Sequence, residues 1–173
     1  KKIVQLLIIG LLISSTLTSI SILAPSVTAA TGTLLTNGNF EAGSASPWSM
    51  AISGSGNTAA LTVTSDAYMG SYAGKIAVTS CNTPSPNGNI AFNSPMLKPT
   101  VGETYTLTFT YKASAAFDAF FLCQTSSSQV YNKYVVCSAS SVWKTVSFKV
   151  GPLPSALYNW FTLRFNRLNT VVI

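Results

Sequence analysis

The stretch 104–112 of the chain reads TYTLTFTYK. Tyr105, Leu107, Phe109 and Tyr111 alternate there with threonines and a lysine, so apolar side chains recur at every second position. Successive side chains of a β-strand point to opposite faces. This period of two therefore predicts a strand with one face on a core and the other in water.

The same alternation returns at 145–150 (TVSFKV), and short runs rich in Val, Ile, Thr, Tyr and Phe recur after residue 30 between clusters of Gly, Pro, Asn and Ser. We expect strands at 33–36, 47–52, 58–64, 73–79, 89–94, 103–113, 117–124, 130–137, 142–150, 158–166 and 170–173. Many short strands at this spacing are typical of an all-β fold, a sandwich or a barrel. No internal repeat or linker is visible, so residues 31–173 are predicted to form one domain.

The first thirty residues have a different character. Lys1 and Lys2 precede an uncharged apolar run over 3–23, which Pro25 and a small-residue stretch over 26–30 follow. A basic start, an apolar middle and small residues at the end predict a secretory signal peptide over 1–30. The apolar run is about 20 residues long, so an uncleaved membrane anchor is the alternative. We expect residues 31–173 to be secreted or displayed at the cell surface.

Charge argues against one class of partner. The chain has 10 basic and 4 acidic residues, and removal of the two signal-peptide lysines (10 − 2 = 8) lowers its net charge from +6 to +4. The eight remaining bases are scattered and form no stripe that could follow a phosphate backbone. Nucleic-acid binding is therefore not predicted.

Three cysteines, Cys81, Cys123 and Cys137, lie in the exported part. An oxidising compartment would allow one disulfide and leave one thiol. Cys123 and Cys137 flank a polar turn, so a hairpin could bring them together, and three buried free cysteines are the alternative. The chain has no histidine, which removes the usual ligand of zinc and haem sites.

The last residues, 170–173 (TVVI), have the apolar pattern of a buried strand with no turn signal after it. A domain rarely ends within such a strand. We therefore expect the strand to continue, and the full-length protein to carry further domains.

Four motifs occur in order along the chain. They are LTNGNFE at 35–41 followed by Pro47-Trp48, GSYAGKIAV at 70–78, LKPTVGETYTLTF at 97–109, and WKTVSF at 143–148. Together they resemble the carbohydrate-binding modules of families four, nine and twenty-two. The resemblance implies a galactose-binding-like jelly roll, a two-sheet antiparallel β-sandwich.

The resemblance also implies a structural Ca²⁺ near the termini, held by oxygen ligands. Glu41 corresponds to a side-chain ligand, and carbonyl groups near Asn39 and Lys75 and the hydroxyl of Ser71 would accompany it. The acidic residues that usually follow the closing strand in such modules are missing here, which puts the site in doubt. The alternative is that Glu41 caps a turn.

Sugar sites need flat apolar rings together with a few polar side chains. On the expected strand 158–166, Trp160 and Arg164 share one face, opposite Phe161 and Phe165. Trp160 could stack on a sugar while Arg164 donates hydrogen bonds. The alternative is that Trp160 covers a sheet edge and the Arg164 side chain extends past it to water.

A second cluster, Tyr131, Lys133 and Gln124, is predicted beside the turn between two strands. The other aromatic residues are expected to pack structurally, namely Trp48, Tyr105, Phe109, Tyr111, Phe121, Trp143, Phe148, Phe161 and Phe165.

Catalysis is not predicted. Residues 31–173 contain four carboxylates only, and glycoside hydrolysis usually needs two that face each other across a cleft. The sequence therefore predicts a non-catalytic module that tethers its host protein to polysaccharide. The alternative is a structural or adhesive extracellular sandwich without a sugar site.

Overall fold

Ten antiparallel strands form two five-stranded sheets in the computed structural model, which describes residues 34–82, 89–125, 128–154 and 158–173. The predicted signal peptide falls outside these residues. The strands are β1 (Ser49–Ile52), β2 (Thr58–Thr64), β3 (Ala73–Ser80), β4 (Ile90–Asn93), β5 (Tyr105–Ala113), β6 (Phe117–Gln124), β7 (Gln129–Cys137), β8 (Ser140–Val150), β9 (Tyr158–Phe165) and β10 (Asn169–Val172). No helix occurs in the described ranges.

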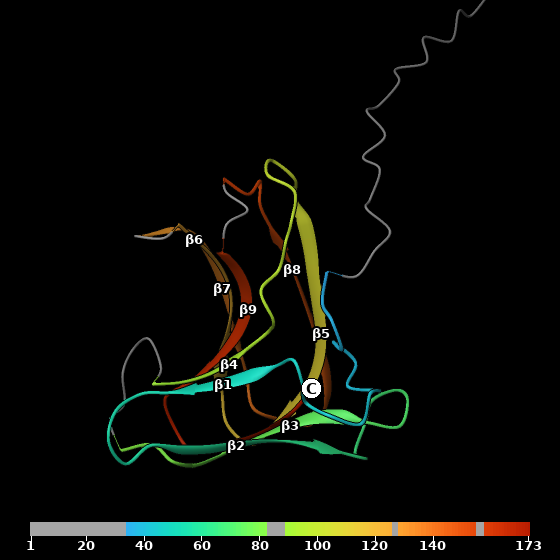
Figure 1. Ribbon diagram of the computed structural model, residues 1–173. Coiled ribbons are helices and arrows are strands. Elements are labelled where there is room, and N and C mark those ends of the chain that lie inside the picture. Colours follow the sequence, from blue (N-terminus) through green and yellow to red (C-terminus); the bar gives the residue numbers. More distant parts are fainter. Residues whose placement is uncertain (1–33, 83–88, 126–127, 155–157) are drawn as a thin grey trace, which may run out of the picture. The chain divides into compact units, whose positions relative to one another are not determined.

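The two sheets pack face to face as a sandwich (Figure 1). Sheet A has the strand order β1-β4-β9-β6-β7, and sheet B has the order β2-β3-β10-β5-β8. Phe109 of sheet B and Phe161 of sheet A meet between them with ring centroids 5.2 Å apart. The predicted two-sheet antiparallel β-sandwich is confirmed.

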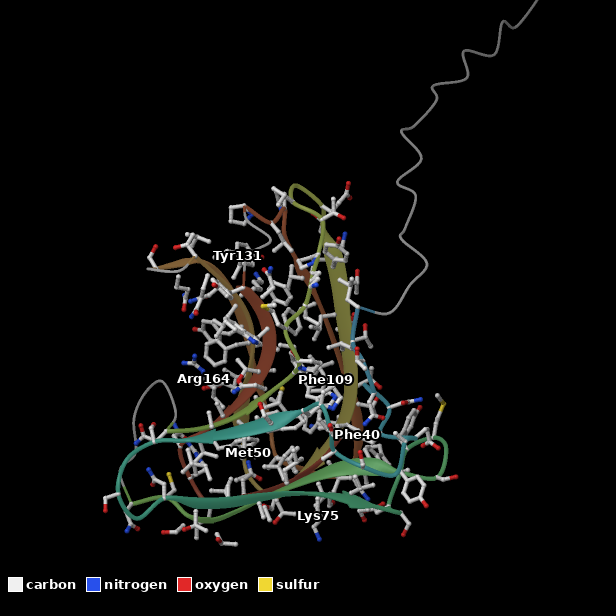
Figure 2. The ribbon with its side chains drawn as sticks, in the orientation of Figure 1. Phe40, Met50, Lys75, Phe109, Tyr131 and Arg164 are labelled. Carbon is white, nitrogen blue, oxygen red and sulfur yellow. The ribbon has the colours of Figure 1, made fainter. Side chains whose placement is uncertain are left out.

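Aromatic rings fill the centre of the core. Trp48 stacks on Phe92 of β4 with centroids 4.8 Å apart, and it meets Phe161 edge-on at 6.2 Å. Phe40 closes this cluster from the segment that precedes β1, and Figure 2 labels it there. Gly74 of β3 has to be a glycine, because a Cβ atom at that position would lie 2.6 Å from the Phe40 ring.

Ten of the eleven expected strands are present, most of them within two residues of the expected bounds. The expected strand at 33–36 is wrong in its described part, because residues 36–39 form a turn. Asn37 adopts a positive φ of 49° there. The Trp48 indole N–H donates to the carbonyls of Thr36 and Asn37, at 3.1 and 3.0 Å. These carbonyls therefore bond to a buried ring and not to a neighbouring strand.

The suggested pairing of Cys123 with Cys137 is also wrong. In the β6–β7 hairpin Cys123 lies opposite Tyr131, whereas Cys137 lies opposite Phe117, at the other end of the ladder. No disulfide joins any of the three cysteines, and Cys123 and Cys137 are buried.

Within the described residues, the chain has no helix of the length and hydropathy needed to cross a bilayer.

Candidate functional site

Strand β9 presents two different faces. Asn159, Phe161, Leu163 and Phe165 are buried and point toward sheet B. The alternate positions point to the outside of sheet A, and they are Tyr158, Trp160, Thr162 and Arg164. Figure 2 labels Arg164 on the far side of this sheet from Phe109, which lies in the core.

The neighbouring strand β6 adds a second row to this outer surface. Its ladder with β9 sets Gln124 opposite Tyr158, Leu122 opposite Trp160, Phe120 opposite Thr162 and Asp118 opposite Arg164. Directly opposed residues of an antiparallel pair point to the same face. Strand β7 continues the rows with Asn132 opposite Leu122 and Tyr134 opposite Phe120. We call this outer surface of β9, β6 and β7 the aromatic face.

The rings of the aromatic face form two stacked pairs. Tyr158 and Trp160 are 6.0 Å apart with planes inclined by 10°. Phe120 and Tyr134 are 5.3 Å apart with planes inclined by 25°. Same-face neighbours on one strand are about 7 Å apart and adjacent strands about 5 Å apart, so the two pairs form separate platforms along the sheet.

Arg164 places a charged group against an aromatic ring of this face. Its guanidinium carbon lies 4.8 Å from the centre of the Phe120 ring, which is cation–π geometry. Burial lowers the pKa of Arg164 from its usual value. An arginine nevertheless stays charged at any physiological pH. Asp118 lies opposite it in the ladder, so both signs of charge occur at this end of the face.

Thr162 lies beneath the aromatic face and is only 1% exposed. Its hydroxyl oxygen finds no hydrogen-bond partner in the described part of the chain. A buried hydroxyl without a partner is costly, and it gains free energy from any group that can bond to it.

The structure separates the predicted sugar-site residues into two groups. Trp160, Arg164 and Gln124 lie on the aromatic face. Tyr131 points the other way, because its ring packs against Phe121 of the core and its hydroxyl accepts the Gly151 N–H at 2.9 Å.

Lys133 is opposite Phe121 in the ladder and therefore lies on the same side of β7 as Tyr131, although it is exposed at the sheet edge. The predicted cluster of Tyr131, Lys133 and Gln124 is thus divided between two sides of the sheet.

Sequence reasoning missed the other rings of the face. Tyr158 has the same strand phase as Trp160, and that signal was available in the sequence. Phe120 and Tyr134 join them only through the order β9-β6-β7, which strand periodicity does not reveal.

The two tryptophans expected to pack structurally also differ. Trp48 is buried in the core as expected. Trp143 instead lies half-buried on the outer side of sheet B, where the Lys112 ammonium sits 4.7 Å from its ring centre and Tyr68 is 5.7 Å away.

Three of the four residues suggested for calcium lie around one turn. The Glu41 carboxylate accepts the N–H of Ser71 at 2.9 and 3.1 Å and that of Tyr72 at 2.9 Å. The Asn39 side-chain oxygen accepts the Glu41 N–H at 3.4 Å. Lys75 lies further along β3, with its carbonyl 3.5 Å from the Thr62 hydroxyl.

Carboxylate, amide and hydroxyl oxygens are suitable calcium ligands. A carboxylate can accept about four hydrogen bonds or metal contacts, so the two N–H donors leave Glu41 with capacity for an ion. The set still contains a single carboxylate. No group of three acidic, His or Cys residues occurs in the described ranges. Glu41, Asn39 and Ser71 could hold the ion, while the contacts that are present already make Glu41 a cap for the 70–72 turn.

No family model matches the sequence, and no curated protein matches it. Solved structures do match. A family 4 carbohydrate-binding module is 17% identical over 80% of this chain and 94% of its own, with a TM-score of 0.57. The CBM22-1 xylan-binding domain of Paenibacillus barcinonensis Xyn10C is 13% identical over 78% of this chain and 86% of its own, with a TM-score of 0.54.

The enzymatically active domain of tailspike protein 4 from bacteriophage CBA120 matches with a TM-score of 0.59 at 15% identity. That match covers 80% of this chain and only 20% of the tailspike chain. The structures similar to this chain are thus mostly binding modules, and the match within an enzyme concerns a fraction of it. The chain has the β-sandwich fold of carbohydrate-binding modules.

Proposed function

We propose that the chain is a non-catalytic carbohydrate-binding module and that the aromatic face binds polysaccharide. The observation that supports this most directly is the pair of ring platforms, Tyr158–Trp160 and Phe120–Tyr134, on the outer surface of sheet A. The fold shared with modules of families 4 and 22 supports it independently.

The chemistry of the face suits a sugar chain. The C–H face of a pyranose ring is apolar and stacks on an aromatic ring, while its hydroxyls need donors and acceptors at the edge. Trp160 supplies the larger ring. Arg164 and Gln124 on neighbouring strands supply an array of N–H donors, and Asn132 adds an amide.

Two platforms favour a polymer over a single sugar. Each ring pair can hold one sugar unit, and the two pairs occupy successive positions of the ladder, since Trp160 is opposite Leu122 and Phe120 is opposite Thr162. A polysaccharide that bridges both platforms makes both stacking contacts but loses its translational and rotational entropy only once.

The distribution of carboxylates supports a role without catalysis. Asp118 is on the aromatic face, whereas Asp66 pairs with Lys112 on sheet B and Glu41 bonds to the turn at 71–72. Glu103 is in the turn before β5. Glycoside hydrolysis by the usual route needs two carboxyl groups across the bond, and a lone Asp118 supplies one.

A module of this kind acts by raising local concentration and lowers no reaction barrier. We propose that it is exported by the segment 1–30 and tethers a larger secreted or surface protein to glycan.

Affinity electrophoresis against a panel of soluble plant and microbial polysaccharides tests the proposal. We expect at least one polymer to retard the native chain and Trp160→Ala to remove that retardation. Trp143→Ala is the matched control, because it deletes a half-buried tryptophan on the other sheet and should leave retardation unchanged. If folded native chain migrates freely through every polymer, a structural or adhesive domain without a sugar site becomes the better description.

A further inference from the structure

Strand β7 is an edge of sheet A. It pairs with β6 on one side, and no strand in the described ranges pairs with it on the other. Backbone N–H and C=O groups alternate in direction along a strand, so about half of those in β7 face this unpaired side. A row of unpaired backbone groups is a template to which another chain can add a strand.

The sequence of β7 is well suited to such pairing. Gln129–Cys137 reads QVYNKYVVC, which contains three valines, two tyrosines and neither proline nor glycine. On its outer side Tyr134 and Val136 are 57% and 63% exposed. Edge segments with high β-propensity, little charge and no proline are those that associate with copies of themselves. Lys133 is the single charged residue of this strand.

Lys133 belongs to the row of β7 that faces the core. It lies opposite Phe121, and its same-side neighbours Tyr131 and Val135 pack against the core. The Lys133 side chain is nevertheless exposed. A lysine in this position keeps its ammonium in water by extending it past the edge of the sheet. It can do so only while no strand covers that edge.

Lys133 is also the middle residue of β7, with four residues on each side of it. When two copies of β7 pair antiparallel over their full length about a twofold axis, Lys133 of one copy lies opposite Lys133 of the other. Like charges directly opposite each other destabilise a sheet. A shift of the register by two residues sets Lys133 opposite Tyr131, but it leaves two residues of each strand unpaired.

Pairing would also enclose the two ammonium groups. A twofold axis perpendicular to the sheet keeps the core-facing rows of both copies on the same side of the joined sheet. Each Lys133 side chain would then lie on the covered side of that sheet, beside a lysine and away from water. Removing a charge from water without an opposite charge to pair with is costly in free energy.

The edge of sheet B on the same side of the sandwich has the same arrangement. Lys144 of β8 lies opposite Tyr111, in the core-facing row that also contains Val146 and Phe148. It is exposed, and its ammonium donates to the Ser138 hydroxyl at 3.1 Å. Each of the two edge strands on this side therefore carries one lysine in its core-facing row. Inward-pointing charges of this kind are a known protection of edge strands against pairing.

We propose that Lys133 keeps the chain monomeric by preventing β7 of a second copy from pairing with β7. The strand has the composition for self-association, and the one charge it contains lies at its centre and in its core-facing row. The proposal gives Lys133 a role that is separate from the aromatic face. It does not depend on sugar binding.

Sedimentation velocity of the full chain and of three variants tests this proposal. We expect Lys133→Val to shift from monomer to dimer as its concentration rises from about 1 μM to 1 mM, whereas the native chain keeps its sedimentation coefficient. Lys133→Glu should behave as the native chain does, because two glutamates also repel each other and resist enclosure. Lys75→Val is the matched control, since Lys75 is an exposed lysine of β3, which has strands on both sides.

Amide exchange locates the contact. In Lys133→Val at the higher concentration, the N–H groups of β7 that face away from β6 should exchange about tenfold more slowly than at the lower concentration. The same groups in the native chain and in Lys75→Val should show no dependence on concentration.

Three results would overturn the proposal. Lys133→Val could sediment as the native chain does at every concentration, or Lys133→Glu could associate as strongly as Lys133→Val. Association of Lys133→Val without slower exchange in β7 would also contradict it, because the contact would then lie elsewhere. Glycan retardation plays no part in these readouts, so a failure here is separable from a failure of the proposed function.

Discussion

The guanidinium carbon of Arg164 lies 4.8 Å from the centre of the Phe120 ring, on adjacent strands of sheet A. The contact holds a long and flexible side chain in one place on the aromatic face. It therefore presents a planar group of N–H donors in fixed orientation beside the Trp160 platform, which a lysine could not reproduce.

Arg164→Lys should accordingly weaken glycan binding. A hydrogen bond that involves a charged group contributes about 1.5–3 kcal/mol, so loss of the guanidinium geometry is expected to reduce affinity about tenfold or more. Titration calorimetry with the retarding polymer measures the change. Arg167→Lys, in the exposed turn after β9, is the control and should bind as the native chain does. Native affinity in Arg164→Lys would show that Arg164 only covers Phe120.

Tyr131→Phe should destabilise the fold and leave glycan binding intact. The hydroxyl accepts the Gly151 N–H at 2.9 Å, and its loss leaves that partly buried donor unpaired at a cost of about 1–3 kcal/mol. Urea unfolding measures this change. The opposite pattern is expected for Tyr134→Ala, which removes an exposed ring of the aromatic face. Reduced binding in Tyr131→Phe at native stability would restore Tyr131 to the sugar site.

Substitution of Glu41 tests the proposed calcium site. We expect millimolar calcium to raise the melting temperature of the native chain relative to EDTA. Glu41→Gln should abolish that rise, because the amide keeps an acceptor for the Ser71 and Tyr72 N–H groups but loses the charge. Glu41→Ala should lower the melting temperature even in EDTA, because both N–H groups lose their acceptor. If calcium and EDTA give the same native melting temperature, Glu41 acts only as a cap of the turn.

Cys137 should make the fold sensitive to alkali. Burial, with a smaller contribution from Asp118, raises the pKa of its thiol from 9.0 to about 12. Above pH 9 the unfolded chain loses a proton that the native chain retains, so stability falls as the pH rises from 9 toward 12 and is unaffected below pH 9.

The slope due to one proton is about 1.4 kcal/mol per pH unit at most. Denaturant unfolding at several pH values should therefore show a shallower alkaline loss in Cys137→Ala, although that variant is less stable near neutral pH. Parallel pH profiles for the two proteins would contradict the assignment.

Strand phase accounts for what could be predicted about the site. Trp160 and Arg164 are four residues apart in an alternating strand, so they share a face whatever that strand pairs with. Their partners Phe120 and Tyr134 come from two other strands, β6 and β7, and the order β9-β6-β7 brings them together. Tyr131 is the opposite case. It is close to Gln124 across the β6–β7 turn, but this proximity does not determine which face of the sheet its ring is on.

The alternation in 104–112 and its repeats was enough to predict an all-β fold, a sandwich or a barrel, because a period of two is a local property of each strand. The choice of a two-sheet antiparallel sandwich came from the resemblance to carbohydrate-binding modules. The same local information placed Phe109 and Phe161 in the core and Trp160 outside it. One feature depends on the assembled sheets. The aromatic face exists because β9, β6 and β7 are neighbours. Strand order depends on contacts between residues far apart in the chain, and no local pattern records it.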